Sequence, residues 1–433
     1  MKKILIISGF VLVTFGIATA LYLTFFRPVP EPPIVEIPLV ELPPHLPVTR
    51  EAWERMTIEE REILGLPRYE WPEELPEIVP PVPVPEVPPV PEVPPEVEEI
   101  SEVAVGGLTW FFPVSDEAVQ NAELAGDGQS GVYYQKETGK FYEIGLDGTK
   151  RLLTDQTFPY ADKITWSPVK DKAIIEFPDG FKVMYDFQKK KQVSLPKEWY
   201  EFSFNTSGRE IAFKTDSKYS EDRWLAVANP DGTSGKAIEH MGDNQDKVIV
   251  SYSPNNQVIA FSATGNPRGA FEQEILLIGK YGENFPPLII DGRGFEPIWS
   301  PQGDKILYSV YSDETNYNPV LYVVDGSGER MGRGKINLGL QTWAHKCTVN
   351  WSGESAYCAV PRNLPRGAGL VPELAANIKD DFYKVDLRTG QASFLAQGAF
   401  GAYNVSKVFL SSDERYLYFV DKDLGRLRYL RLK

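Results

Sequence analysis

The chain has 433 residues and a net charge of −15, with 60 acidic against 45 basic side chains. Residues 104–433 are close to neutral and show no basic excess, which argues against nucleic acid as a partner. The chain has only three His and two Cys residues, and neither type occurs in a metal-binding pair spacing, so the sequence predicts no metal site and no cofactor.

The N-terminal residues 1–27 resemble a membrane anchor. The stretch 4–26 is almost entirely apolar and long enough, as a helix, to cross a bilayer. Lys2 and Lys3 precede it, which places the N-terminus in the cytoplasm and the rest outside, at the cell membrane. The alternative is a signal peptide cleaved after Ala18-Thr19-Ala20. Either way, the sequence predicts an extracytoplasmic location, periplasmic or at the cell surface.

Residues 28–103 have the composition of an extended stalk. They hold 20 of the 36 prolines and, with Arg27, carry 18 Glu and 5 Arg, so most of the net charge lies here. Proline-rich runs favour polyproline II over a helix or a central strand. The proline-free segment 49–66 has a capping-box pattern and predicts a short helical insert.

From residue 104 to 433 one phrase recurs: a hydrophobic strand, an aromatic or apolar residue, Ser-Pro or a variant, and a second strand. The recurring position falls every 38 to 59 residues. Repeats of this length, built from strands and turns, are typical of β-propeller blades. The recurring position is occupied by Trp166, Phe204, Tyr252, Trp299, Trp351 and Leu410. Of these, Trp166, Tyr252, Trp299 and Trp351 are predicted to pack between blades.

Counting pairs of second and third strands predicts an all-β propeller of seven blades, with six as the alternative. The last repeat ends at Lys433 with no room for a fourth strand. A strand from the N-terminal side would then close the ring, and residues 108–112 are the candidate. Residues 104–433 would thus form one domain.

The repeats resemble the TolB-like (WD-like) propeller repeat of bacteria. The best match is the phrase Trp299-Ser300-Pro301-Gln302-Gly303-Asp304-Lys305-Ile306-Leu307-Tyr308. The resemblance covers roughly residues 130–433 and implies an exported propeller that binds something. It does not imply the role of TolB itself, because the anchor and stalk replace the N-terminal domain of that protein.

The loops from second to third strands are expected to be long in four consecutive blades. They span residues 215–223, 263–274, 312–319 and 361–378, and two of them contain Pro-Arg-Gly-Ala. Long loops on one face of a rigid scaffold commonly carry a binding site. The alternative is that the loops only pack over the blade tops. The candidate binding residues are Asn266, Arg268, Tyr317, Asn363 and Arg366.

The sequence predicts no catalytic residues. No Gly-x-Ser-x-Gly motif occurs. The expected function is therefore a non-catalytic binding or scaffold module for an envelope protein or a surface polymer. The alternative is a carbohydrate-active enzyme, a glycosidase or lyase, with paired carboxylates at the propeller channel. Available acids include Asp291, Glu296, Asp313 and Glu314.

Cys347 and Cys358 flank the turn around residues 352–354, on two neighbouring antiparallel strands. Counting outward from the turn sets them directly opposite each other, at a separation that a disulfide can bridge. Export would supply the oxidising environment. We therefore predict a disulfide, and the alternative is a pair of buried free thiols.

Overall fold

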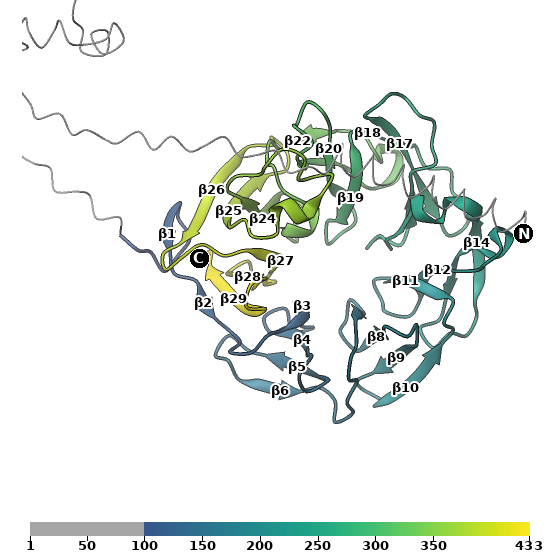
Figure 1. The fold of residues 1–433 in the computed structure, drawn as a ribbon, viewed down its shortest axis with the longest axis horizontal. Helices are drawn as coiled ribbons and strands as arrows, with labels where there is room; N and C mark the ends of the chain where they lie inside the picture. The colour runs from purple at the N-terminus through teal and green to yellow at the C-terminus, as the bar shows by residue number, and fades with distance from the viewer. Residues whose placement is uncertain (1–98) are drawn as a thin grey trace, which may run out of the picture. The chain divides into compact units, whose positions relative to one another are not determined.

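The computed structural model describes residues 99–433, and the predicted anchor, the helical insert and most of the stalk lie outside this range. No helix within residues 99–433 has the length and hydrophobicity needed to span a membrane. The described residues form seven sheets arranged around a central axis (Figure 1). Seven blades are thus confirmed over six.

The first four blades each use four consecutive strands. Blade 1 comprises β3 (Gln120–Leu124), β4 (Gly131–Gln135), β5 (Lys140–Ile144) and β6 (Lys150–Leu152). Blade 2 comprises β7 (Lys163–Trp166), β8 (Lys172–Glu176), β9 (Lys182–Asp186) and β10 (Lys191–Leu195). Blade 3 comprises β11 (Trp199–Phe204), β12 (Ile211–Thr215), β13 (Trp224–Ala228) and β14 (Lys236–His240). Blade 4 comprises β15 (Val248–Val250), β16 (Val258–Ser262), β17 (Glu272–Gly279) and β18 (Leu288–Asp291).

The last three blades complete the ring. Blade 5 comprises β19 (Arg293–Trp299), β20 (Lys305–Tyr311), β21 (Val320–Asp325) and β22 (Ile336–Asn337). Blade 6 comprises β23 (Cys347–Val349), β24 (Ser355–Pro361), β25 (Asp380–Asp386) and β26 (Ala392–Gly398). Blade 7 comprises β27 (Val405–Leu410), β28 (Tyr416–Asp421) and β29 (Arg426–Arg431). Five short 3-10 helices lie in the connections: η1 (Ser220–Asp222), η2 (Gly242–Lys247), η3 (Gly328–Arg330), η4 (Ala344–Lys346) and η5 (Pro372–Ala375).

The N-terminal segment closes the ring, as predicted, but it does so with two separate strands. β2 (Phe112–Pro113) pairs antiparallel with β29 and supplies the missing fourth strand of blade 7. β1 (Gly107–Thr109) instead pairs in parallel with β26, as a fifth strand on the outer edge of blade 6. The predicted closing segment 108–112 is thus shared between two blades.

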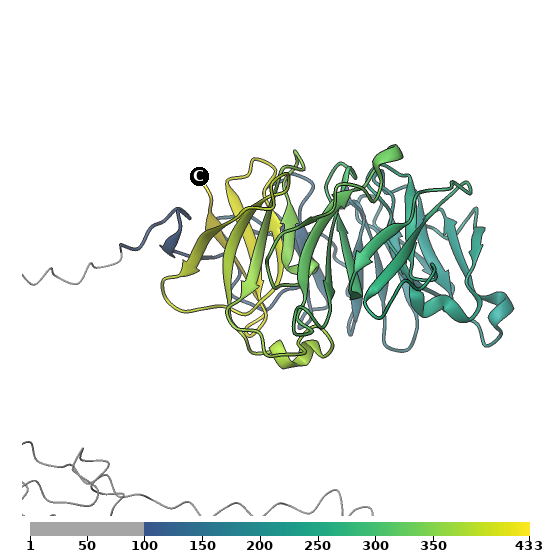
Figure 2. The same ribbon diagram turned by 90° about the horizontal axis from the view of Figure 1, so that it is seen from above.

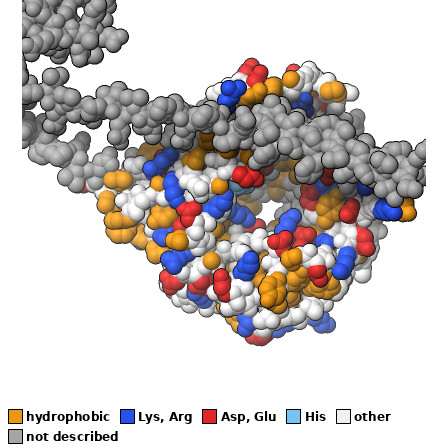
Figure 3. Space-filling view, in the orientation of Figure 1, with side chains coloured by type: hydrophobic (Ala, Val, Ile, Leu, Met, Phe, Trp, Pro, Cys, Tyr) orange, Lys and Arg blue, Asp and Glu red, His pale blue; other side chains and the backbone are white. Residues whose placement is uncertain are grey.

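Strand order defines two faces of the propeller. Because strands within a blade alternate in direction, the second-to-third-strand loops and the connections between blades emerge together. We call this side the loop face and the other side, with the remaining turns, the turn face. The strands run between the two faces (Figure 2). On the face shown in Figure 3, acidic and basic side chains are interspersed and the ring is hollowed at its centre.

The Ser or Asn that follows the inner strand in blades 2 to 7 has a physical role in the turn. Ser253 Oγ accepts hydrogen bonds from two backbone N–H groups, those of Gln257 and Val258. Asn350 Oδ1 does the same for Glu354 and Ser355. The side chain thus satisfies donors that the tight turn leaves without a strand partner.

Three of the four predicted aromatic packing residues lie between blades. Trp166 and Tyr252 are buried, and the half-buried Trp299 donates from Nε1 to Ser251 Oγ of blade 4. Trp166 Nε1 likewise donates to the backbone oxygen of Asn121 in blade 1. The aromatic residue therefore both fills the wedge between two blades and hydrogen-bonds across it.

The prediction for Trp351 is wrong, because this side chain is 65% exposed. Asn350 makes the turn hydrogen bonds that Ser300 makes in blade 5. Val349, which is buried, therefore occupies the position equivalent to Trp299. Trp351 lies past the end of its strand, within the turn, because the Trp-Ser pair of this blade is displaced along the chain relative to the other repeats.

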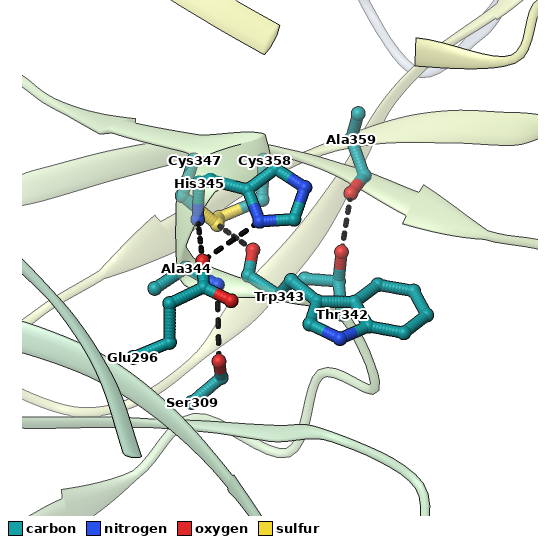
Figure 4. The surroundings of a disulfide bond; sticks show 9 residues. All are labelled: Glu296, Ser309, Thr342, Trp343, Ala344, His345, Cys347, Cys358 and Ala359. Carbon is teal, nitrogen blue, oxygen red and sulfur yellow. Dashed lines mark hydrogen bonds and ion pairs between the residues drawn. A yellow bond between two sulfur atoms is a disulfide. The ribbon is translucent and has the colours of Figure 1, made fainter. Parts of the chain in front are cut away.

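The predicted disulfide between Cys347 and Cys358 is confirmed. The two residues face each other in the β23–β24 register, with a Cα–Cα distance of 4.1 Å. Both are buried, and Figure 4 shows them beside Trp343 and His345 on η4 and the adjoining connection. The bond fastens the inner strand of blade 6 to the strand that leads into the longest loop.

We expect replacement of both cysteines by alanine to lower the free energy of unfolding by at most about 3 kcal/mol, because the closed loop is short. Chemical denaturation of both proteins measures this difference. Intact mass after alkylation without reductant should show no modified cysteine in the parent chain, and two modified thiols would contradict the assignment.

Candidate binding surface on the loop face

Long loops from blades 4, 5 and 6 meet on the loop face. They are the connections 263–271, 312–319 and 362–379, which follow β16, β20 and β24. The corresponding blade 3 segment, 216–223, has no hydrogen bond, ion pair or ring contact with these three loops in the described residues. The predicted surface over blades 3 to 6 is therefore joined only over blades 4 to 6.

Tyr317 lies at the centre of this junction. Its ring centroid is 6.0 Å from that of Phe271 in the blade 4 loop, in an edge-to-face arrangement. The guanidinium of Arg366, from the blade 6 loop, lies 5.7 Å from the Tyr317 centroid. Ring contacts and cation–π attraction thus connect side chains from three blades. Two predicted candidates, Tyr317 and Arg366, are brought together.

Backbone hydrogen bonds hold the blade 5 and blade 6 loops in register. Gly367 N–H donates to Asn316 O at 2.9 Å, and Gly369 N–H donates to Tyr317 O at 2.8 Å. Asn316 and Tyr317 have φ of 56° and 57°, a left-handed conformation that is uncommon for a tyrosine. The contacts from the neighbouring loop hold Tyr317 in this conformation and so orient its ring.

Arg268 is engaged within its own loop. Its Nε and Nη2 donate to Glu274 Oε1 at 3.0 and 2.7 Å, and these bonds hold the pKa of Glu274 below its usual value. The loop tip is also tied to blade 5, where Arg293 donates to the backbone oxygens of Gly269 and Ala270. Arg268 is therefore paired within its own blade, and its role in binding stays a prediction.

The two asparagine candidates do not join the cluster. Asn266 uses its backbone N–H to reach Glu274 Oε2 at 2.9 Å. Asn363 is exposed on the blade 6 loop. Neither side chain forms a hydrogen bond within residues 99–433. They remain predictions.

Sequence reasoning missed three apolar side chains beside Arg366. Leu370, Val371 and Leu374 are 52%, 47% and 50% exposed, and the last lies on η5. Ala368 and Ala375 of the same loop are buried in a small cluster with Trp343. A Leu-Val-Pro-Glu-Leu stretch inside a predicted loop was the available signal. We call the set Phe271, Tyr317, Arg366, Leu370, Val371 and Leu374 the loop-face surface.

Arg366 is the charged residue of the loop-face surface whose guanidinium is free to pair with a partner's carboxylate. Arg268 is paired with Glu274, and Arg362 of the blade 6 loop donates to Asp381 Oδ1 at 2.7 Å. Arg366 makes no ion pair within residues 99–433. A guanidinium over an aromatic ring, next to exposed apolar side chains, is a combination typical of protein interaction sites.

Of the four acids considered for catalysis, only Glu296 lies on an inner strand, β19. Glu296 Oε1 accepts from His345 Nδ1 at 2.7 Å and from the His345 backbone N–H at 2.8 Å (Figure 4). Asp291 is paired with Lys335 on the outer part of the ring. Asp313 and Glu314 lie in the blade 5 loop. No group of three or more His, Cys, Asp or Glu side chains in the described part of the chain is arranged to hold a metal.

Glu176 is a half-buried acid on β8 whose carboxylate is only partly satisfied. Its Oε1 is buried without a hydrogen-bond partner in the described residues, and Lys163 Nζ is 3.9 Å away. Burial raises the pKa of Glu176, and the charges of Asp162 and Glu201 act in the same direction, against Lys163. Glu201 itself is paired with Lys214.

No protein-family model and no curated protein matches this sequence. Among solved structures, it is similar to an oligogalacturonate lyase in complex with manganese, with a TM-score of 0.51 and 13% identity over 75% of this chain and 90% of that one. It is also similar to the β-propeller domain of Myceliophteria thermophila Cps50 (Swd1), with a TM-score of 0.49 and 11% identity over 75% of this chain and 100% of that one. The similarity to the lyase structure, at 13% identity, shows the fold alone. The seven sheets of residues 99–433 make this part of the chain a seven-bladed β-propeller.

Proposed function

We propose that this protein is a non-catalytic binding module that holds a protein partner on its loop-face surface. The observation that carries the proposal is the meeting of three loops around Tyr317, with Arg366 available and three apolar side chains exposed beside it. Exposed apolar side chains next to an arginine and aromatic rings favour a protein over a polymer of hydroxyl groups.

The proposal also includes the cellular location of the module. The apolar N-terminal stretch, residues 1–27, and the acidic Pro-rich residues 28–103 support display from the cell membrane into the extracytoplasmic space. The TolB-like repeat phrase supports an exported propeller. The partner would then be another envelope protein, and a wall or surface polymer is the second class that the experiment below detects.

The double substitution Arg366→Glu/Leu374→Asp should abolish partner capture. It reverses the available charge and places a carboxylate in the apolar part of the surface. Affinity-tagged full chain, incubated with envelope extract and resolved by mass spectrometry and glycan analysis, measures the capture. The melting temperature should change little, because both side chains are exposed.

Trp351→Ala is the matched control. It removes an exposed large side chain from the turn face, where no partner is expected. Capture should be as strong as for the parent chain. Loss of capture in this control, or retention of capture in the double variant, would overturn the proposed surface.

A second candidate function is a carbohydrate-active enzyme, supported by the half-buried Glu176, whose Oε1 lacks a hydrogen-bond partner within residues 99–433 and whose pKa is raised by burial and by the charges of Asp162 and Glu201. A carboxyl group with a raised pKa is suited to act as a general acid. If the chain cleaves wall polysaccharide, Glu176→Gln should lower the release of new reducing ends at least about 100-fold. Our proposal expects no release above background from either protein.

A further inference from the structure

The outer edge of blade 3 has features of a peptide-docking edge. Within residues 99–433 its last strand, β14, pairs only with β13, so one side of the strand is open there. Most other outer strands have little or no free edge for pairing with another strand. β6 has three residues, β22 and β2 have two each, and the edge of β26 is already paired with β1. Of the five-residue outer strands, β10 and β14 remain open within the described residues.

Blade 6 shows that an outer edge of this propeller accepts a fifth strand. Residues Gly107–Thr109 pair with Ala396, Gln397 and Gly398 along the edge of β26, and Gly106 N–H donates to Leu395 O at 2.9 Å. Figure 1 shows β1 alongside β26. Strand addition of this kind supplies affinity through main-chain hydrogen bonds, and pockets for alternate side chains supply specificity.

β14 differs from β10 because hollows flank it on both sides. On the blade 4 side, a cavity of about 760 Å³ runs between β14 and the second half of β17. On the blade 2 side, a cavity of about 400 Å³ lies over Trp199, Phe213 and Trp224. Lys236 and Ala237 of β14 line both cavities.

The larger cavity results from incomplete pairing in blade 4. β18 pairs only with Glu272 to Ile275, the first half of β17. The second half has a single bridge on this side, between Ile278 and Asn284. Pro286 and Pro287 follow, and proline has no N–H to extend the ladder. The space that a longer fourth strand would fill therefore remains open.

The smaller cavity has the chemistry of a site for a basic side chain. Its half-buried walls are the indoles of Trp199 and Trp224. Three carboxylates, Glu198, Asp216 and Asp222, border it, and none of them makes an ion pair within residues 99–433. Indole faces and carboxylates together attract a guanidinium or an ammonium group.

We propose that β14 binds an extended segment of a partner protein as a fifth strand, with a basic side chain of that segment in the Trp199–Trp224 cavity. Because side chains alternate along a strand, the residues on either side of the basic one would face the larger cavity. That cavity offers Leu276 and Ile278 as apolar contacts. This site is separate from the loop-face surface and does not depend on it.

Synthetic heptapeptides of alternating residues test the proposal with the full chain. A fluorescent valine–arginine peptide should bind, and the valine–glutamate peptide should bind at least tenfold more weakly. Methylation of the valine–arginine backbone at alternate nitrogens should abolish binding, because strand addition needs those donors. Hydrogen exchange of residues 236–240 should slow with the peptide, while exchange of residues 191–195 on β10 should not change.

Variants separate this site from the proposed loop-face partner. Asp216→Asn/Asp222→Asn should weaken the valine–arginine peptide at least tenfold, whereas Arg366→Glu/Leu374→Asp should bind it like the parent chain. Equal binding of the methylated peptide, unchanged exchange at residues 236–240, or no binding at millimolar peptide would each overturn the proposal. Binding that is instead lost in the Arg366→Glu/Leu374→Asp variant would also overturn it.

Discussion

Replacement of Asp380 by alanine is expected to lower the free energy of unfolding by about 3–5 kcal/mol, because it leaves a buried lysine without its counter-ion. Asp380 is 1% exposed and accepts hydrogen bonds from Lys346 Nζ at 2.9 and 3.0 Å. It also accepts the backbone N–H of Val405 at 2.7 Å. Urea denaturation followed by intrinsic fluorescence measures the loss.

The size of this effect follows from the position of the pair. Burial raises the pKa of Asp380 and lowers the pKa of Lys346, and the attraction between the two charges opposes both shifts. The pair joins η4, the start of β25 and the start of β27. Blade 6 is thus tied to blade 7 directly below the loop that carries Arg366.

A double variant distinguishes the unpaired charge from the loss of packing. Lys346→Met/Asp380→Asn removes both charges, and the asparagine oxygen can still accept from Val405. We expect it to recover at least half of the stability lost in Asp380→Ala, because removing both partners avoids the uncompensated charge. A double variant as unstable as the single one would show that the charge pair is not the cause.

Replacement of Phe111 by alanine should cost about 3–5 kcal/mol, the range for deleting a buried aromatic side chain. Phe111 immediately precedes the closing strand β2 and is 7% exposed. Its ring lies edge-to-face with Phe382 of blade 6 and Phe419 of blade 7, both at 5.3 Å between centroids. The substitution therefore opens a cavity where the N-terminal segment closes the ring.

Trp110→Ala is the control for this prediction. Trp110 is the adjacent residue, is 42% exposed and contacts the exposed Phe400. Its removal should cost no more than about 1 kcal/mol, as is usual for partly exposed positions. Thermal denaturation of the three proteins under one condition gives the comparison. Equal losses for the two variants would contradict the role of Phe111 as the ring-closing core residue.

Local patterns in the sequence determined the blades. Turn residues such as Asp-Gly and Ser-Pro act within a few positions, so they predicted the strand pairs and the count of seven. The disulfide was predictable for the same reason, since a short turn sets the register of Cys347 against Cys358. The need for a borrowed strand followed from the missing fourth strand of blade 7.

Contacts between distant segments were decided only by the tertiary structure. The phrase alignment placed Trp351 between blades, but hydrogen bonding at Asn350 places it in the turn. Repeated Pro-Arg-Gly-Ala sequences made Arg268 and Arg366 look equivalent. In the structure, Arg268 pairs with Glu274 of its own blade, whereas the guanidinium of Arg366 lies over the ring of Tyr317 from another blade. Loop packing depends on neighbours far along the chain, and no short-range pattern encodes it.

The same limit applies to the surfaces proposed for binding. Sequence alone determined that this chain carries a repeated antiparallel scaffold with long loops on consecutive blades. The exposure of Leu370 and Leu374, and the cavities beside β14, arise from how adjacent blades and loops leave space between them. That space depends on side chains from three or more segments at once, which is why only the folded structure decides it.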